Sequence, residues 1–288
     1  MEFIVKLNKL DDLYVIDNAS SYLIANRKFS YRYDKSFCLN KTRIVKKYCK
    51  ENNKKVYVLV NKIFKDHELE ELKLYLEKLI KIDVDGIFFA DFAVFMLLKE
   101  LNASNKAIFY HETFLRNTKD ILTYQQIGIE RIICSKDMNI EDIKNLPVEN
   151  KYQYGIMCFG YFPLYQSERK IISNYIELNS LKKSLVNSKE LTLKEHTREE
   201  HYRVIEQNGI SSIFNSEVLS YDEYIKELSN NIDMFIFDSL FFDANYIRQV
   251  IELFNKARTG ENIKEELKSV NENISFTSGF INKRIGLM

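Results

Sequence analysis

Between residues 39 and 147 the sequence alternates short runs of β-branched and aromatic residues with longer stretches of helical periodicity. Four runs predict strands, at residues 56–60, 86–90, 107–110 and 131–134. In the stretch between the first two, apolar residues recur every three or four positions from Leu69 to Ile80, which predicts an amphipathic helix. Strands that alternate with helices favour a parallel sheet with helical crossovers.

Two further units extend this alternation toward the ends of the chain. A strand at 21–24 precedes a predicted helix at 39–51, and a strand at 234–237 precedes one at 244–256. With a first strand within residues 1–10, six or seven β/α repeats favour a closed or nearly closed (β/α)8 TIM-like barrel of the α/β class over an open sheet. We therefore expect the barrel to span residues 1–260, with residues 261–288 as a tail packed on it.

The stretch from about 184 to 215 interrupts the rhythm. It is rich in Thr, Glu, Lys and His, and Asn208-Gly209 is a typical hairpin turn. These features predict a small antiparallel insertion. Elsewhere, Asp66, Asn117 and Asn139 are predicted helix caps, because a short polar side chain before a helix can accept from its free N–H groups.

The charges exclude one class of function. The chain has 42 Lys and Arg against 41 Asp and Glu, so it lacks the broad basic surface of a protein that grips nucleic acid unaided. The N-terminus has no long apolar segment followed by a cleavage site, and no apolar run is long enough to span a membrane. We expect a cytoplasmic protein without membrane contact, whose four separated cysteines are reduced thiols.

Polar residues that follow the predicted strands are the candidate site, because the carboxyl ends of barrel strands share one face. The set can bind an anionic or polar ligand by charge-assisted hydrogen bonds. It comprises Arg32, Asn61, Asp91, His111, Lys136, Ser167, Arg169 and Asn215. Each also has a structural explanation when taken singly; Asp91, for example, can cap the helix that begins at Phe92.

No motif identifies a catalytic or metal-binding set. The sequence lacks a G-x-S-x-G elbow, a phosphate-binding P-loop, an H-E-x-x-H pair and any C-x-x-C pair. Ser167 lies two residues from Arg169, but arginine cannot deprotonate a hydroxyl at neutral pH. The catalytic residues therefore stay unknown at this level, and no metal ligands are predicted.

Residues 159–169 read FGYFPLYQSER and resemble the central motif of the collagenase-like peptidase family U32: a glycine, then Pro-Leu or Pro-Met, then Ser-x-Arg. Shorter runs that resemble the family occur in the same order along the chain. They are FSYR at 29–32, VYVLVN at 56–61, DVDGIFFAD at 83–91, GIERII at 128–133 and IFNS at 213–216. The resemblance thus covers most of the chain.

The sequence departs from the family pattern at three places, one of which is the family's glutamate in the strand before the central motif, replaced near Gly155. In the family a cysteine follows the arginine of the central motif and more cysteines lie downstream, whereas here Lys170 follows Arg169 and the last cysteine is Cys158. The family's Ala-Arg-Glu is replaced by Ser135-Lys136-Asp137, which keeps the charges but loses the forked guanidinium. The resemblance therefore implies that this chain alone binds no four-iron four-sulfur cluster, and no other cofactor is predicted.

The resemblance implies two kinds of activity. The family is named for peptidases of unknown catalytic type, while other members support oxygen-independent hydroxylation of the tRNA wobble uridine or of a quinone precursor, some as pairs of paralogous chains. Our first interpretation is a non-cluster partner subunit in 5-hydroxyuridine formation, working with a cysteine-bearing paralog and meeting tRNA only in that complex. Lys136 and Arg169 would bind an anionic group, which Asn61 and Asp91 would orient. The alternatives are a peptidase, and a degenerate barrel that binds a small ligand or a protein.

Overall fold

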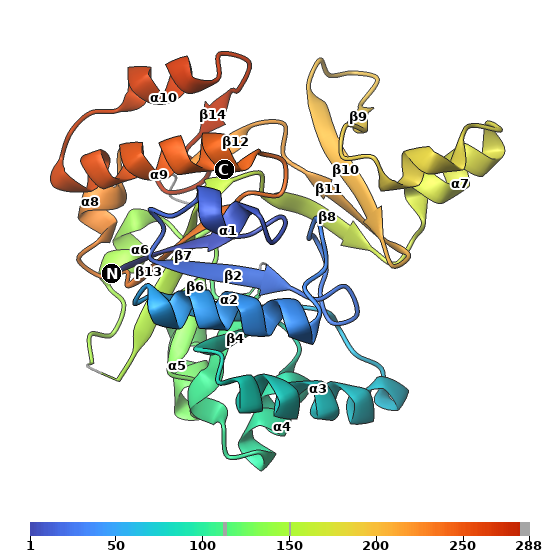
Figure 1. Ribbon diagram of the computed structural model, residues 1–288. Helices are drawn as coiled ribbons and strands as arrows, with labels where there is room; N and C mark the ends of the chain where they lie inside the picture. The colour runs from blue at the N-terminus through green and yellow to red at the C-terminus, as the bar shows by residue number, and fades with distance from the viewer. Residues whose placement is uncertain (112–113, 150, 283–288) are drawn as a thin grey trace.

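Eight parallel strands close into a barrel in the computed structural model, which describes residues 1–111, 114–149 and 151–282 (Figure 1). In order around the barrel the strands are β1 (Glu2–Lys6), β2 (Ser21–Ala25), β3 (Lys55–Val60), β4 (Gly86–Phe89), β5 (Ala107–Tyr110), β6 (Arg131–Cys134), β7 (Gln153–Gly160) and β13 (Met234–Asp238). Because β13 pairs in parallel with both β7 and β1, these eight strands form a closed barrel. The predicted (β/α)8 fold is confirmed.

Helices connect the strands and cover the outside of the barrel. They are α1 (Asp12–Val15), α2 (Leu39–Glu51), α3 (Leu69–Ile82), α4 (Phe92–Glu100), α5 (Thr118–Gln126), α6 (Ile140–Lys144), α8 (Ile225–Leu228) and α9 (Ala244–Thr259), with 3-10 turns η1 (Asp66–Glu68) and η2 (Ser104–Lys106). The apolar face of α3 shows why they bind the barrel: Leu72, Leu76 and Leu79 are fully buried. Burying one such side chain contributes about 1.5–3 kcal/mol.

Two of the three predicted helix caps are confirmed. Asn117 accepts from the backbone N–H groups of Lys119 and Asp120 at 3.0 Å, and Asn139 accepts from that of Asp142 at 2.9 Å. The cap predicted at Asp66 is wrong, because Asp66 is itself the first residue of η1. At this helix start the carboxylate of Glu68 instead accepts from the Lys65 N–H at 3.0 Å.

The barrel interior is filled by large side chains. The innermost cluster contains Ile4, Leu23, Tyr57, Leu59, Phe88, Ile108, Ile133, Met234 and Ile236. Gly86 makes room for this packing, since a Cβ there would lie 2.7 Å from Cδ1 of Ile108. The lumen is therefore a packed core, and a ligand can enter only at its ends.

A four-stranded antiparallel sheet lies at the mouth side of the barrel, with order β8-β11-β10-β9 (Figure 1). Its strands are β8 (Pro163–Ser167), β9 (Thr192–Lys194), β10 (His201–Gln207) and β11 (Ile210–Phe214), with α7 (Ile171–Leu178) and η3 (Lys183–Asn187) between β8 and β9. Asn208 and Gly209, with φ of 54° and 80°, form the predicted turn between β10 and β11. The sheet begins earlier than residue 184, because β8 follows the barrel strand β7 and pairs with β11.

The last described part of the chain packs on the barrel. β12 (Val218–Ser220) runs antiparallel to the end of β7, and β14 (Phe276–Thr277) pairs with β12 after α10 (Lys264–Val270). Farther on, the carbonyl of the buried Ile281 accepts from the Ile140 N–H at 2.8 Å. Within the described residues, no helix combines the length and apolar character needed to cross a membrane.

Candidate functional site

A buried ion pair lies at the centre of the barrel mouth. Lys6 is the last residue of β1 and Asp238 the last of β13, and these adjacent strands bring their side chains together in a salt bridge. The Lys6 ammonium also donates to the Arg32 carbonyl at 3.0 Å, and only 4% of Lys6 is exposed. Charges in such a place are stable only with partners, so the pair fixes the loops that meet above the lumen.

Arg32 and His111 meet beside this pair. Arg32 has a φ of 58°, a left-handed conformation that costs a non-glycine residue about 1–2 kcal/mol, and it is 9% exposed. Burial, and then the charge of Arg32, lower the pKa of His111, so the imidazole is neutral at pH 7. The ring of His111 stacks on Phe114 with centroids 4.3 Å apart.

The loop after β6 adds a second cluster of charges. The buried carboxylate of Asp137 pairs with Lys136 at 2.9 Å and with Arg116 at 2.7 Å. The Lys136 ammonium also lies 5.2 Å from the ring centroid of Phe162, which follows β7. Arg116 comes from the neighbouring loop before α5, so two cations share one carboxylate and the cluster has a net positive charge.

Two of the predicted site residues hold neighbouring loops in place. Asn61 accepts from the Tyr31 N–H at 2.9 Å. One oxygen of Asp91 caps α4 by accepting from the Ala93 N–H at 2.9 Å, and the other accepts from the Phe64 N–H at 2.8 Å. The cap predicted for Asp91 at the start of α4 is thus confirmed. Asn61 and Asp91 both hold the backbone of neighbouring loops in place.

The other three predicted residues lie at or beside the small sheet. The Ser167 hydroxyl accepts from the Arg169 N–H at 3.2 Å, and Arg169 is exposed. Asn215, just after β11, bonds to the carbonyls of Phe162 and Glu217. The structure therefore brings Arg32 and His111 together, places Lys136 on another loop of the mouth, and leaves Ser167, Arg169 and Asn215 on a separate wall.

The small sheet, which forms this wall of the mouth, is attached to the loop after β2. Gln207 accepts from the Tyr33 N–H at 3.3 Å and donates to its carbonyl at 2.5 Å, while Lys189 pairs with Asp34 at 2.9 Å. Asn208 donates to the Arg27 carbonyl at 2.5 Å. These contacts border a cavity of about 590 Å³ between the small sheet and the loop after β2, the loop that also carries Arg32.

Sequence reasoning missed Lys6. A lysine at the end of the apolar run 3–5 was the available signal, because a charged side chain on a buried barrel strand needs a partner inside the fold. Its partner Asp238 ends another strand, but their contact depends on barrel closure. Spacing in the sequence cannot reveal such a pair.

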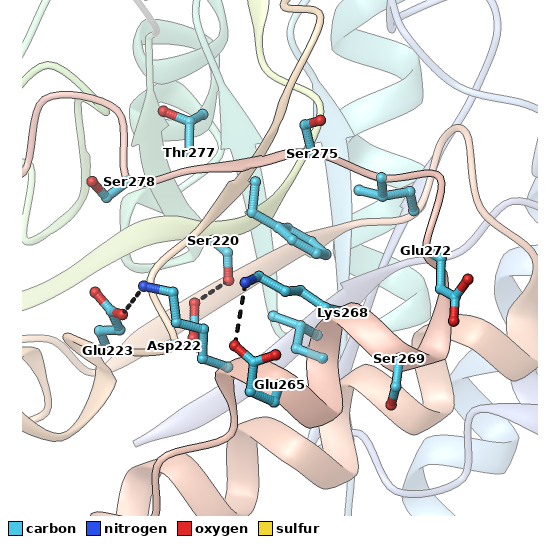
Figure 2. Close-up of a pocket in the computed structure, with 14 residues that line it drawn as sticks. Ser220, Asp222, Glu223, Glu265, Lys268, Ser269, Glu272, Ser275, Thr277 and Ser278 are labelled. Carbon is cyan, nitrogen blue, oxygen red and sulfur yellow. Dashed lines mark hydrogen bonds and ion pairs between the residues drawn. The ribbon is translucent and has the colours of Figure 1, made fainter.

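A second cavity, of about 630 Å³, lies outside the barrel between β12, α10 and β14 (Figure 2). Its lysines are already paired: Lys264 with Glu223 at 2.8 Å, and Lys268 with Glu265 at 3.2 Å. On its wall Ser220 donates to Asp222 at 2.5 Å, and burial raises the pKa of that carboxyl. We assign the candidate site to the mouth, because there the charged groups are buried and converge from several strands.

The family model described as Peptidase family U32 matches residues 9–286. The chain belongs to peptidase family U32. A Bacillus subtilis (strain 168) protein named tRNA hydroxylation protein P2 is 24% identical over 243 residues, which cover 83% of this chain and 79% of that protein. The solved structure of the U32 peptidase Mk0906 has a TM-score of 0.52 at 10% identity and covers 83% of this chain and 92% of its own, which shows a shared fold.

The cysteines of this U32 chain do not fit a four-iron four-sulfur cluster. Cys38 is exposed beside α2, whereas Cys49, Cys134 and Cys158 are buried on α2, β6 and β7. A four-iron four-sulfur cluster needs about four ligands at one site, whereas these four thiols lie on separate elements. Among the described residues, no group of three or more His, Cys, Asp or Glu side chains could hold a metal ion.

Proposed function

We propose that this chain is a non-cluster subunit in the formation of 5-hydroxyuridine at the tRNA wobble position. The observation that carries the proposal is the similarity to tRNA hydroxylation protein P2 over 83% of the chain, within a shared family. The cluster ligands are assigned to a cysteine-bearing paralog that works beside this chain. A balance of 42 basic and 41 acidic residues agrees with tRNA contact through that complex.

In this proposal the barrel mouth binds a polar, anionic group. Arg32 and the Lys136–Arg116–Asp137 cluster supply positive charge, and the neutral imidazole of His111 can donate one hydrogen bond and accept another. The buried Lys6–Asp238 pair keeps the mouth rigid. The cavity bordered by Gln207 and Tyr33 then gives the remainder of the ligand its space.

The proposal is tested by wobble-nucleoside analysis. Cells that lack this chain should lose 5-hydroxyuridine derivatives from their tRNA, as measured by mass spectrometry of digested tRNA, and the wild-type chain should restore them. An Arg32→Gln variant should fail to restore them, whereas Arg43→Gln, on the exposed face of α2, should succeed. Unchanged nucleosides in the deletion, or hydroxylation of tRNA by the purified chain alone, would refute the subunit role.

A further inference from the structure

Arg203 lies against two aromatic rings at the junction between the small sheet and the barrel. Its guanidinium carbon is 4.7 Å from the ring centroid of Tyr161 and 5.1 Å from that of Phe241. Tyr161 follows β7 and Phe241 follows β13, whereas Arg203 belongs to β10, so the contact joins the small sheet to two loops of the mouth. Cation–π attraction holds the charged group at this place.

Arg203 is the lysine or arginine of the β9–β10 hairpin that has no carboxylate partner among the described residues. Lys194 pairs with Glu199 at 2.6 Å. Arg198 pairs with Glu195 at 3.0 Å. In the part of the chain that the structure describes, the Arg203 guanidinium forms neither an ion pair nor a hydrogen bond, although the residue is partly shielded from solvent. A shielded charge is normally paired, so this guanidinium can take an anion from outside the chain.

The two rings position the guanidinium without using its hydrogen-bond donors. An aromatic ring attracts the positive charge but supplies no oxygen to accept from the five N–H groups. These N–H groups form a rigid fork that matches two oxygens of a phosphate. Arg203 is therefore held in place by contacts that leave its donors for a ligand.

The location of Arg203 favours phosphate among the anions. β7 and β13 are the seventh and eighth strands around the barrel, and (β/α)8 proteins frequently bind phosphate at the loops that follow these two strands. Next to Phe241, the Leu240 carbonyl accepts from the Lys189 ammonium at 3.2 Å. Lys189 also pairs with Asp34 at 2.9 Å, so this nearby carboxylate is neutralised and does not repel an anion.

We propose that Arg203 anchors a phosphate-binding site where β10 meets the loops after β7 and β13. Phosphate is the chemistry shared by two sources, the phosphodiester backbone of an RNA and a small phosphorylated molecule. The inference does not depend on the proposed function, since either source would give Arg203 its anion.

Phosphate binding is tested at the Arg203 side chain itself. Inorganic phosphate, titrated into the wild-type chain, should shift the NMR signal of the Arg203 Nε–H until the site saturates, whereas sodium chloride of equal ionic strength should not. The Nε–H of Arg198 is the internal control, because that nitrogen already pairs with Glu195 at 3.0 Å. An Arg203 signal that responds to phosphate no more than to chloride overturns the proposal.

Two substitutions separate a phosphate anchor from a general effect of charge. Arg203→Gln should weaken phosphate binding by about tenfold or more, measured as the dissociation constant by isothermal titration calorimetry, because it removes a charged donor. Arg203→Lys should recover only part of the affinity, since lysine keeps the charge but lacks the fork. Arg198→Gln, on the same hairpin, is the matched control and should bind phosphate as the wild type does. Equal affinities of Arg203→Gln and the wild type refute the anchor.

Two further probes distinguish the sources of the phosphate. A uridine hexanucleotide without a terminal phosphate offers phosphodiesters alone, whereas uridine monophosphate offers a single phosphate group. Displacement of inorganic phosphate from Arg203 by the hexanucleotide assigns the site to RNA, and displacement by the monophosphate alone assigns it to a small ligand. If neither probe displaces inorganic phosphate, the site holds inorganic ions only and the proposal is wrong.

Discussion

At the scale of single residues, the structure of the barrel mouth depends on charged side chains that are largely shielded from water. Lys6 and Asp238 have 5% and 16% exposed side chains, and each gives the other a partner. Breaking a buried pair leaves one charge without compensation, which costs far more than breaking a surface pair. The mouth is thus a region where one substitution changes both stability and site geometry.

Lys6→Met should lower the free energy of unfolding by about 3–5 kcal/mol, because Asp238 then stays buried without its cation. Urea denaturation measures this loss. Lys73→Met is the control, since it breaks the exposed Lys73–Glu100 pair on the outer helices and should change stability very little. If the two substitutions lower the free energy of unfolding equally, the Lys6–Asp238 pair contributes no more to stability than an exposed pair.

His111 should titrate below its ordinary pKa of 6.5, because burial and the charge of Arg32 disfavour the imidazolium. The unfolded chain binds this proton more readily than the fold does, so stability falls as pH drops below about 6.5 toward the lowered pKa. NMR titration of the imidazole Cε1–H should report the lowered pKa. Arg32→Gln should raise it, whereas Arg43→Gln should leave it unchanged. A pKa at or above 6.5 in the wild type would contradict this account of the mouth.

At the scale of elements, apolar periodicity locates most of the barrel. The predicted helix 39–51 and the predicted strands 107–110 and 131–134 coincide with α2, β5 and β6, because the two strands are short buried runs and α2 buries one face of a helical pattern. The small sheet was only partly predictable. β8 is mostly exposed and has no continuous apolar face, and its pairing with β11 spans more than forty residues. A local pattern cannot encode such a long-range pairing.

Helix caps give a direct test at this scale. Asn117→Ala should cost about 1 kcal/mol of stability, because the Asn117 side chain satisfies two free N–H groups at the start of α5. Asp66→Ala should have almost no effect, since Asp66 lies inside η1 and does not cap it. Thermal unfolding of both variants measures the difference. A larger loss for Asp66→Ala would restore the cap that the sequence predicted there.

At the scale of the whole molecule, the candidate site depends on closure of the barrel and on attachment of the small sheet to it. Arg32, His111 and Lys136 follow β2, β5 and β6, and sequence reasoning could group them because parallel barrel strands end on one face. The attachment of the small sheet to the β2 loop was not, since it rests on side-chain bonds to backbone groups far away in the sequence. The wall of the mouth is therefore known only from the structure.

Gln207→Ala should loosen this wall, because it removes both bonds between Gln207 and the backbone of Tyr33. Hydrogen exchange followed by mass spectrometry should then show faster exchange at the Tyr33 amide, while the barrel strands keep wild-type rates. Gln166→Ala, on the exposed strand β8, is the matched control. Unchanged exchange at Tyr33 would mean that other contacts hold the small sheet in place.

The position of β13 in the chain affects how the protein is made. β13 is the last barrel strand to leave the ribosome, and it must pair with β1, whose Glu2 lies opposite Met234. Until then the nascent chain has two unpaired strand edges, on β1 and β7, while the small sheet is still being synthesised. Pairing across so much sequence is slow, so the unfinished chain is most exposed to aggregation late in translation, when chaperones would protect it.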